Sequence, residues 1–298
     1  MISKEDVTVV LPTLNEEKAI GKIIDELIEE GYKNILVVDG YSTDRTVEIA
    51  REKGAKVVYQ KGKGKAGAIR TAIELVDTPY ILVMDADLTY DPKDIAKLLE
   101  YADHDEVIGL RSDRKNIPLL HRFGNKVIST TISLLMGQRV SDPCSGMYLL
   151  KTDTARRMES IAEGFDIETE IVSWMLTHGR LAEVPIGYRK RKGEKKLRTF
   201  RDGLRIIFTA VKMAWLYNPA FLLSTAGSTL VVPGIIILIW QLSIRYFYGA
   251  EKWSLGWAWL GLVLLVIGLQ CFSVATITIM LKRMERRILS MLRSLGTK

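Results

Sequence analysis

Residues 80–91 read "YILVMDADLTYD", a short apolar run followed by several carboxylates. The first five residues have the length and composition of a buried strand. Asp91 and the proline after it have the pattern of a helix N-cap and first helical residue. Asp85 and Asp87 are therefore not needed as caps, and an acidic pair at the end of a buried strand costs stability unless its charge is compensated. A divalent cation would compensate it, because Mg²⁺ or Mn²⁺ is commonly held by one or two carboxylates plus substrate phosphates.

Short β-branched runs alternate with helical patterns up to about residue 190. We predict five strands, at Val7 to Leu11, Ile35 to Val38, Lys56 to Tyr59, Tyr80 to Met84 and Glu106 to Gly109. Between the first two strands, apolar residues recur at helical spacing from Ile20 to Ile28, and Gly31 ends this helix. The sequence therefore predicts an α/β fold whose mainly parallel sheet is covered by helices on both faces.

Ligands of such sheets bind beyond the carboxyl ends of the strands. Three polar segments stand at predicted strand ends, "PTLNEE" at 12–17, "DGYSTDRT" at 39–46 and "DADLTYD" at 85–91. A further segment, "KGKGKAG" at 61–67, fits the G-x-G-x-x-G spacing of a dinucleotide-binding turn. It follows the third predicted strand rather than the first, and the aspartates about 20 positions later belong to a different site. We therefore expect no resident nicotinamide or flavin cofactor.

Composition excludes several classes of protein. With 298 residues and 48% hydrophobic content, the chain can form one large domain or two smaller ones. Cys144 and Cys271 lie far apart in the sequence, so neither a disulfide framework nor a zinc site is indicated. The start, "MISKEDVTVVLP", lacks the apolar segment of a signal peptide, and we expect the first part of the chain to stay in the cytoplasm.

The net charge of +7 is unevenly distributed, because nine Lys and Arg residues lie between positions 189 and 205. Such a cluster requires an anionic partner or a solvated face. Nucleic acid is one candidate partner, but the apolar segments that follow the cluster favour lipid. We therefore expect no nucleic acid.

Residues 219–244 and 253–281 contain no Asp, Glu, Lys, Arg or His side chain. A helix needs roughly 20 apolar residues to cross the ~30 Å hydrocarbon core, so each segment is long enough to span the cell membrane. Two buried core helices are the alternative. The linker 245–252 is short, which predicts an antiparallel hairpin. Lys and Arg residues before and after the hairpin favour a cytoplasmic location for the catalytic domain and both termini.

Amphipathic segments flank the hairpin on both sides. Apolar residues recur at helical spacing beside basic residues in 198–218, which predicts an interfacial helix in the headgroup region. In the basic cytoplasmic tail, residues 282–298, apolar residues also share one stripe opposite arginines. A membrane surface and a partner helix account equally well for the pattern of the tail.

Seven motifs in register over residues 12–171 resemble the family 2 glycosyltransferases of GT-A fold. They are "PTLNEE", "VVDGYSTDRT", "GKGKAGAIRTA", "VMDADLTYDP", "IGLR", "DPCSGMYLL" and "FDIETEI". More narrowly, they resemble the dolichol-phosphate mannose synthase branch, whose basic loop is matched by "YRKRKGEKKL" at 188–197. The resemblance implies a catalytic domain over residues 1–197 that loads a sugar onto a polyprenyl phosphate.

This resemblance implies a site for a nucleotide-sugar donor. By similarity, the residues at the base and ribose would be Pro12, Leu14, Glu16 and Asp39, and Lys65 would face the diphosphate or the ribose. Asp85 would lie near the nucleotide, and Asp87 would bind the Mg²⁺ or Mn²⁺ that bridges the diphosphate. Relatives often supply a further metal ligand, usually Gln, where this chain has Thr89, so the part of Thr89 in the metal shell is open.

The same resemblance implies residues for the acceptor phosphate. They would be Arg111, then Arg122 and Asn125 on the following helix, and Lys190, Lys192 and Lys196 in the basic loop. A polyprenyl monophosphate loses its second proton near pH ~6, so its oxygen is already a nucleophile at neutral pH and needs no strong general base. We expect Arg111 and the basic loop to act by aligning and neutralising the two anions, and direct attack to invert the anomeric centre.

The expected reaction transfers a hexose or N-acetylhexosamine from a UDP- or GDP-linked sugar to dolichyl or another polyprenyl phosphate at the lipid bilayer. One alternative is a membrane glycosyltransferase that elongates a polysaccharide or modifies a protein, but the Gln-x-x-Arg-Trp motif of processive synthases is absent. Another is a non-catalytic membrane scaffold of the same fold, against which the presence of both Asp85 and Asp87 argues. The donor base, the sugar, the lipid length and the oligomeric state stay open, and a homo-oligomer is compatible with the sequence.

Overall fold

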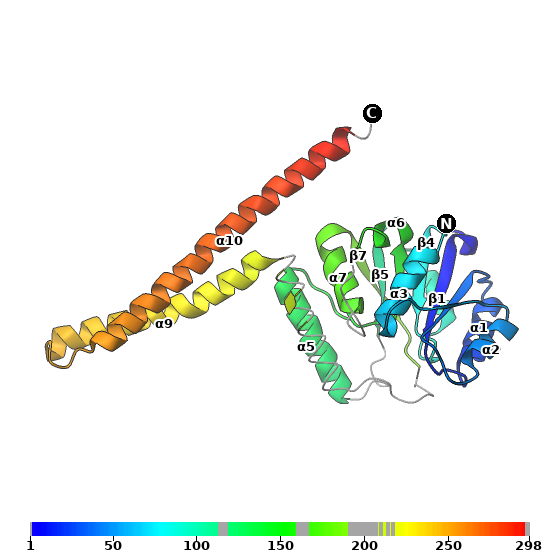
Figure 1. Ribbon diagram of the computed structural model, residues 1–298, viewed down its shortest axis with the longest axis horizontal. Helices are drawn as coiled ribbons and strands as arrows, with labels where there is room; N and C mark the ends of the chain where they lie inside the picture. The colour runs from blue at the N-terminus through cyan, green and yellow to red at the C-terminus, as the bar shows by residue number, and fades with distance from the viewer. Residues whose placement is uncertain are drawn as a thin grey trace. The chain divides into compact units, whose positions relative to one another are not determined.

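The computed structural model describes residues 2–112, 119–158, 167–189, 208, 211–212, 215 and 218–295. The chain divides into two compact units, Met1–Met213 and Ala214–Lys298 (Figure 1). We call the first the catalytic unit, after the catalytic domain that the resemblance implies, and the second the hairpin unit; each is described by itself.

The described part of the catalytic unit contains one seven-stranded sheet in the order β3-β2-β1-β4-β6-β5-β7. The strands are β1 Val7–Thr13, β2 Ile35–Asp39, β3 Lys56–Tyr59, β4 Tyr80–Met84, β5 Glu106–Arg111, β6 Met147–Lys151 and β7 Leu181–Ile186. Only β6 runs antiparallel to its neighbours, so the prediction of a mainly parallel α/β sheet is confirmed.

All five predicted strands are present, and two of them extend further than the sequence indicated. β1 continues to Thr13, so Pro12 belongs to the strand, and β5 continues to Arg111, which therefore ends the strand rather than following it. The sequence did not predict β6 and β7. β6 lies between β4 and β5, and it therefore holds the two halves of the sheet together.

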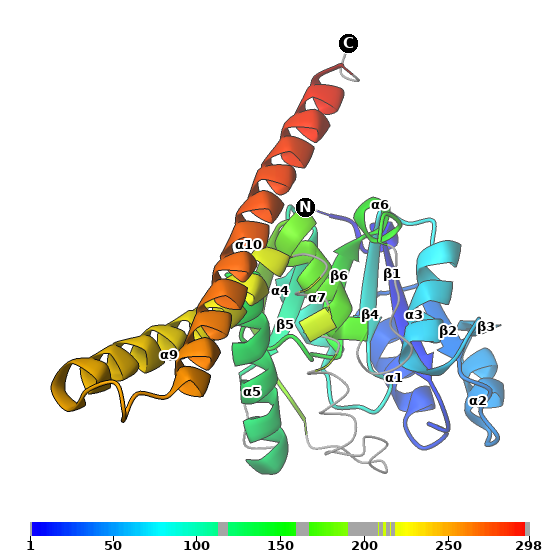
Figure 2. The same cartoon turned by 60° about the vertical axis from the view of Figure 1, so that its left-hand side comes forward.

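The helices of the catalytic unit are connected to the strands in the order expected of an α/β fold (Figure 2). They are α1 Ile20–Glu29, α2 Thr46–Glu52, α3 Gly64–Leu75, α4 Ile95–Leu99, α5 Leu119–Met136, α6 Thr152–Ala155 and α7 Ile167–His178, with 3₁₀ turns η1 Lys4–Asp6 and η2 Pro92–Asp94. The predicted cap is confirmed, because the side chain of Asp91 accepts a hydrogen bond from the backbone of Lys93 with Pro92 at the first helical position.

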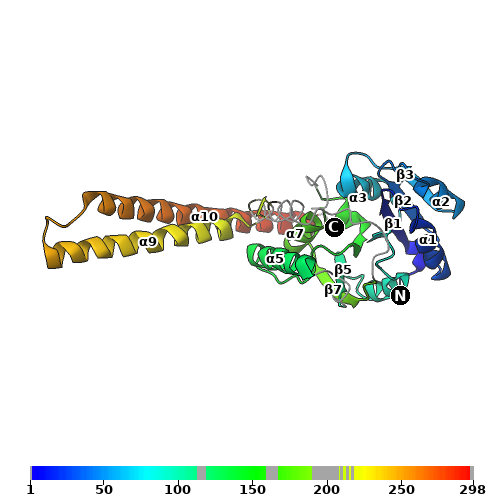
Figure 3. The ribbon, with the colours of Figure 1, turned by 90° about the horizontal axis from the view of Figure 1, so that it is seen from below.

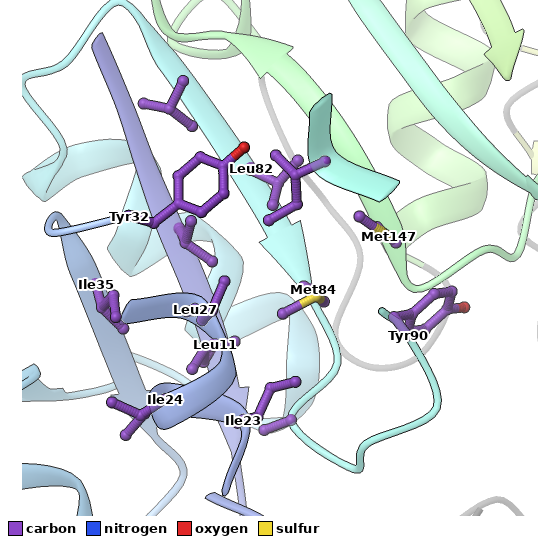
Figure 4. Close-up of a cluster of buried hydrophobic side chains, with 14 of the residues drawn as sticks. Leu11, Ile23, Ile24, Leu27, Tyr32, Ile35, Leu82, Met84, Tyr90 and Met147 are labelled. Atoms are coloured by element: carbon purple, nitrogen blue, oxygen red, sulfur yellow. The ribbon is translucent and has the colours of Figure 1, made fainter. Parts of the chain in front are cut away.

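Two clusters of buried apolar side chains lie on opposite faces of the sheet. The first contains side chains of α1, α2 and α4, including Ile24 and Leu27, together with Tyr32 of the loop after α1, and Figure 4 shows these three beside Leu11 of β1. The second contains side chains of α3 and α7, including Ile69 and Ile171. The predicted covering of both faces is therefore confirmed. Ile28, the last residue of the predicted apolar stripe, is half exposed.

The hairpin unit consists of α9 Pro219–Tyr248 and α10 Leu255–Leu295, which lie side by side (Figure 3). Residues Pro219–Tyr248 and Leu255–Leu281 are long and apolar enough to cross a membrane. Few of their side chains are buried within the unit, so the alternative of two buried core helices is not supported. Most of the predicted interfacial helix at 198–218 lies outside the described residues, although Val211 and Trp215 are exposed.

Glycines bring the backbones of α9 and α10 together. A Cβ atom on Gly234 would lie 2.9 Å from the carbonyl oxygen of Gly261, and one on Gly227 would lie 2.9 Å from that of Gly268. The two pairs are seven residues apart on each helix, the repeat of a left-handed coiled coil. One repeat further, the side chain of Gln241 accepts a hydrogen bond of 3.0 Å from the backbone of Ser254. Close packing of this kind requires glycine, because any larger residue would push the helices apart.

Candidate active site

The loops that follow β1, β2 and β4 meet at one edge of the sheet, as parallel strands require. Among the described residues that are not glycine, only Asn15, Tyr41 and Leu88 have a positive φ, at 53°, 65° and 64°. Each of these three residues lies in one of the three loops. A left-handed conformation of this kind costs on the order of 1–3 kcal/mol and persists only where the surrounding contacts determine it. The backbone at this edge is therefore held in a specific shape.

Asp39 is the centre of the first half of the site. The side chain is fully buried at the end of β2. Its carboxylate accepts hydrogen bonds from the backbone and hydroxyl of Ser42, at 2.7 and 2.5 Å, and one of 3.3 Å from the hydroxyl of Thr13. These bonds fix the loop after β2 against the end of β1.

Asn15, in the loop after β1, also forms hydrogen bonds with the loop after β2. Its backbone donates a hydrogen bond of 2.9 Å to the hydroxyl of Ser42, and its side-chain oxygen accepts one of 2.8 Å from the backbone of Thr43. The backbone of Glu16 donates to the hydroxyl of Thr46 at 2.8 Å. Side chains thus satisfy backbone groups that would otherwise lie unpaired in two irregular loops.

The residues predicted at the donor base and ribose accordingly lie near one another. Pro12 is half buried in β1, Leu14 is exposed, Glu16 is half buried, and Asp39 ends the neighbouring strand. The structure thus places these four positions along the ends of β1 and β2.

The stretch "KGKGKAG" spans the loop after β3 and the first turn of α3, which begins at Gly64. Gly62 has a φ of 86°, which a residue with a side chain rarely adopts. A Cβ atom on Gly67 would lie 2.8 Å from the carbonyl oxygen of Lys61, so the loop folds back tightly onto the helix. The result is that Lys65 stands on the first turn of α3 and points toward β4.

Lys65 lies between two carboxylates. Its ammonium nitrogen is 2.6 Å from Oδ1 of Asp85 and 2.5 Å from Oε1 of Glu168 on α7. Burial alone would lower the pKa of Lys65, but the charges of Asp85 and Glu168 outweigh this effect and raise the pKa well above its usual value. Burial raises the pKa of Glu168, and Lys65 opposes that shift. The lysine is therefore a fixed cation that connects three elements of the site.

Gly146 makes room for Asp85. A Cβ atom at position 146 would lie 2.0 Å from Oδ2 of Asp85, a distance that no side chain can occupy. The backbone of Asp85 also donates a hydrogen bond of 3.0 Å to the carbonyl of Gly146. The hydroxyl of Tyr90 in turn accepts one of 2.7 Å from the Gly146 amide. The motif "DPCSGM" thus accepts a hydrogen bond from the Asp85 backbone and leaves space for the Asp85 carboxylate.

Asp87 and Thr89 form a pair within the same loop. Both residues are buried, and the backbone and hydroxyl of Thr89 donate hydrogen bonds to Oδ1 of Asp87. The hydroxyl of Thr89 therefore orients the carboxylate of Asp87.

The two aspartates fit a divalent cation only together with a substrate. Among the described residues, no group of three or more His, Cys, Asp or Glu side chains is arranged to hold a metal ion. Asp85 and Asp87 can supply two carboxylate oxygens, which is the usual protein contribution where substrate phosphates complete the shell of Mg²⁺ or Mn²⁺. The residues therefore fit a metal that arrives with a diphosphate.

Arg111 is already paired with an acidic residue. Its guanidinium makes a two-point contact with Asp142, at 2.7 and 2.5 Å, and donates a further hydrogen bond of 3.2 Å to the carbonyl of Cys144. The guanidinium also lies over the ring of Tyr188, 5.4 Å from its centroid. Burial raises the pKa of Cys144 to about 12, so this residue is a thiol that packs the loop.

Arg189 stands at the entry to the basic loop. Its guanidinium is 2.7 Å from Glu26 and 2.5 Å from Asp91, and its backbone donates a hydrogen bond of 2.7 Å to the carbonyl of Thr89. The loop's predicted phosphate-binding residues, Lys190, Lys192 and Lys196, lie outside the described residues.

Two predicted acceptor residues lie on α5. Arg122 is exposed and Asn125 is half buried. Both positions lie on the helix that follows β5, and their role at the acceptor phosphate stays a prediction.

Four residues that organise the site, Glu168, Gly146, Asp142 and Tyr90, were not among the predicted binding or catalytic residues. Their motifs, "FDIETEI", "DPCSGM" and "VMDADLTYDP", were the available signal, but the contacts depend on side chains far apart in sequence. Only the folded chain shows that these motifs meet at Asp85 and Arg111.

Comparison with known proteins places this fold in a family. The family model described as Glycosyl transferase family 2 matches residues 8–157. Glycosyltransferase AglJ of Haloferax volcanii is 34% identical over 244 residues, which are 79% of this chain and 80% of that protein. The Dolichyl-phosphate hexose transferase of Haloferax volcanii is 35% identical over 216 residues, 70% of this chain and 94% of that protein.

A solved structure agrees in fold. Glucosyl-3-phosphoglycerate synthase from Mycobacterium tuberculosis, crystallised with Mn²⁺, uridine diphosphate and glucosyl-3-phosphoglycerate, matches with a TM-score of 0.57 and 20% identity. The match covers 71% of this chain and 79% of that one. With the family model spanning half of the sequence and close relatives along most of it, the chain belongs to glycosyltransferase family 2, and its catalytic unit has the GT-A fold.

Proposed function

We propose that this chain transfers a hexose or N-acetylhexosamine from a UDP- or GDP-linked sugar to dolichyl or another polyprenyl phosphate, with inversion at the anomeric carbon. The observation that carries the proposal is the group of Lys65, Asp85 and Glu168 at the carboxyl edge of the sheet, in a chain that also has two helices able to cross a membrane. The relative named as a dolichyl-phosphate hexose transferase supports the choice of acceptor.

The donor would bind along the ends of β1, β2 and β4. Asp39 would contact the base and ribose together with Pro12, Leu14 and Glu16, and Lys65 would face the diphosphate. Asp85 and Asp87 would hold Mg²⁺ or Mn²⁺, which neutralises the charge of a leaving nucleoside diphosphate when it is bound. The Mn²⁺ and uridine diphosphate named with the solved relative are consistent with this assignment. Thr89 would keep the Asp87 carboxylate in position, because its hydroxyl already donates to it.

The acceptor phosphate would approach from the side of β5 and α5. Its residues would be Arg111, Arg122, Asn125, Lys190, Lys192 and Lys196. Asp142 compensates the charge of Arg111, so this arginine would act by presenting a fixed donor geometry rather than an uncompensated charge. The basic residues that follow position 189 would supply most of the positive charge needed to bring two anions together.

The nucleophile would need no enzymatic base. A phosphomonoester is largely dianionic at neutral pH, so one of its oxygens can attack the anomeric carbon directly. Glu168 is paired with Lys65 and buried, which makes it a structural counter-ion rather than a proton acceptor. Chain residues would therefore bind, align and neutralise the reactants. The bond between the anomeric carbon and the diphosphate would break, and the nucleoside diphosphate would leave from the face opposite the attacking oxygen.

The hairpin would keep the catalytic unit at the membrane surface. A long isoprenoid chain leaves the bilayer only at a cost of ~0.8 kcal/mol for each buried CH₂ group, so the enzyme must work where the headgroups are. We propose that the catalytic unit and both termini lie in the cytoplasm, because basic residues precede and follow the two spans.

A donor screen tests the proposal directly. Membranes that contain the protein are incubated with polyprenyl phosphate and each of a set of radiolabelled UDP- and GDP-sugars. We expect one donor to give a glycolipid that mild acid cleaves, and we expect a chelator to abolish the product and added Mg²⁺ or Mn²⁺ to restore it. Failure with every donor would contradict the proposed function, and full activity after chelation would contradict the metal.

A further inference from the structure

Two exposed tyrosines stack on each other beside Asp39. The ring centroids of Tyr41 and Tyr59 are 5.3 Å apart, and the ring planes differ by 14°. The rings come from different segments, because Tyr41 lies in the loop after β2 and Tyr59 ends β3. Tyr41 is 62% exposed and Tyr59 is 48% exposed. Much of this aromatic surface is therefore open to solvent.

The register of the sheet fixes where these rings stand. Thr13 of β1 lies opposite Asp39 of β2, and Asp39 lies opposite Tyr59 of β3. Residues directly opposite each other in neighbouring parallel strands point to the same face of the sheet. Thr13, Asp39 and Tyr59 therefore form a row on one face, at the carboxyl ends of three adjacent strands. The stacked pair stands at the end of this row, next to the carboxylate that we propose at the donor base.

Two of the four exposed aromatic side chains in the described part of the catalytic unit stand at this edge of the sheet. Tyr41 follows β2 and Tyr59 ends β3, and the exposed Leu14 follows β1. Tyr41 also keeps a φ of 65°, a conformation that a bulky residue adopts only at a cost. Aromatic surface held in a strained conformation beside a binding loop is typical of a ligand contact.

We propose that Tyr41 and Tyr59 form an aromatic platform on which the base of the nucleotide-sugar donor stacks. This inference rests on the proposed function and names a part of its donor site. The base would add a third ring to the stacked pair while one of its edges faces Asp39. Every nucleobase has a π-face, so the platform supplies affinity rather than selection among bases.

Selection would come from Asp39. A carboxylate accepts hydrogen bonds and cannot donate them, and three of the sites around this carboxylate are already used by Ser42 and Thr13. Uracil and guanine carry an N–H group in the ring that can donate to a carboxylate, whereas adenine and cytosine carry none. The platform would therefore raise the affinity for all nucleotides, whereas Asp39 would set the order of affinity among the different bases.

Binding measurements without acceptor or sugar test the platform. Affinities of the full-length protein in detergent are measured for UDP, GDP, ADP and inorganic diphosphate, each with Mn²⁺, by calorimetry. The variants are Tyr41→Ala, Tyr59→Ala and Tyr41→Phe. The matched control is Tyr101→Ala, because Tyr101 is 46% exposed and also contacts a ring, that of His104, but precedes β5 at the opposite edge of the sheet.

We expect each alanine variant at the platform to weaken the binding of the preferred nucleoside diphosphate by about five- to hundredfold. Inorganic diphosphate, which has no base, should bind all variants as it binds the wild type. Tyr41→Phe should stay within about twofold of the wild type, since its ring is retained, and Tyr101→Ala should behave as the wild type.

Two results would overturn the platform alone. In the first, the wild type binds nucleoside diphosphates and both alanine variants bind them with the same affinity. In the second, the alanine variants lose as much affinity for inorganic diphosphate as for the nucleoside diphosphate. A wild type that binds no nucleoside diphosphate at all would contradict the proposed function and, with it, the platform. Thermal melting of each variant shows whether a loss of binding reflects unfolding.

Discussion

Glycine permits close approach in both units of this chain, but the group that approaches differs. In the catalytic unit, Gly146 leaves space for the charged carboxylate of Asp85. In the hairpin unit, Gly227 and Gly234 leave space for the backbone of the other helix. One unit thus depends on a single charged group at one point, whereas the other distributes its close contacts along two helices. We expect mutations in the first to abolish function and mutations in the second to weaken it by degrees.

The largest effect should follow the loss of a carboxylate in the catalytic unit. Asp87→Ala should reduce turnover roughly thousandfold, because the diphosphate would lose its compensating charge while the fold is retained. Initial rates with the preferred donor and a thermal melt measure the two quantities. Asp77→Ala is the control, since Asp77 is almost fully exposed and precedes β4 at the opposite edge of the sheet. Retained activity in Asp87→Ala would contradict the proposed metal role.

The next effect concerns the support of Asp85. Gly146→Ala should lower turnover roughly hundredfold, because the new methyl group would displace the Asp85 carboxylate by about an ångström or more. The control is Gly124→Ala in α5, where a Cβ atom meets nothing within 4 Å. We expect this control to keep full activity and to gain slightly in stability, since alanine favours a helix over glycine. Equal activities of the two variants would show that Asp85 needs no such space.

A smaller effect should follow in the hairpin. Gly234→Ala should destabilise the packing of α9 against α10 by about 1–3 kcal/mol, because its methyl group would meet the backbone of Gly261 and Leu265. Gly256→Ala is the control, since only the Ser254 hydroxyl lies near, at 3.9 Å. Unfolding in detergent micelles measures the difference, and nucleotide binding should not change.

A double variant sharpens the same comparison. Gly234→Ala combined with Gly227→Ala should destabilise the hairpin by about the sum of the two single effects, since the sites lie roughly 10 Å apart along the helix. If the double variant is no less stable than one of the single variants, the packing of the hairpin depends on one position, as the active site does. The proposed contrast between a single critical point and distributed contacts would then be wrong.

The smallest effect should appear in the pH dependence of stability. Glu106 on β5 is buried, and one of its oxygens has no hydrogen-bond partner in the described part of the chain. Burial, with the nearby charges of Glu183 and Glu168, raises its pKa well above the usual 4.5. The folded chain therefore binds this proton more tightly than the unfolded chain does. Its contribution to stability is complete below pH 4.5 and is lost as the pH rises toward the folded pKa.

Glu106→Gln removes this titration while keeping the shape of the side chain. We expect the Tm of the variant to match or fall slightly below that of the wild type at pH 4, and to gain on it steadily as the pH rises to 8. Each 1 kcal/mol corresponds to about 2–4 °C in a domain of this size. A difference in Tm that does not change with pH would show that Glu106 is ionised in the fold.

The parts of the fold that could be predicted are those whose pattern is contained in a short stretch of sequence. These are the apolar runs of β1, β2 and β4 and the helical spacing of apolar residues in α1, which are recognised without reference to distant residues. β7 was missed because it contains Glu183 and Pro185, which seldom occur in central strands. The strand lies at the edge of the sheet, where Pro185 needs no hydrogen-bonding partner. β6 was missed because it depends on pairing with two strands remote in sequence.

The same distinction applies to the site. Asp85 was identified from its place at the end of a predicted strand, and the resemblance to the family added Asp39 and Lys65. Their partners could not be inferred, since Lys65 meets Glu168 across a hundred residues of chain and Arg111 meets Asp142 only after β5 and β6 pair. Sequence reasoning thus identifies groups that carry charge, while the fold decides which charges compensate each other.

The hydrogen bonds that join the loops after β1 and β2 have a thermodynamic consequence for ligand binding. Asn15, Ser42 and Thr43 are fixed to one another by contacts within the chain, and no ligand is needed to form them. The conformational entropy of these loops is therefore lost during folding rather than at the moment a ligand arrives. A molecule that enters between them need not order the backbone, so more of its contact energy is retained as affinity.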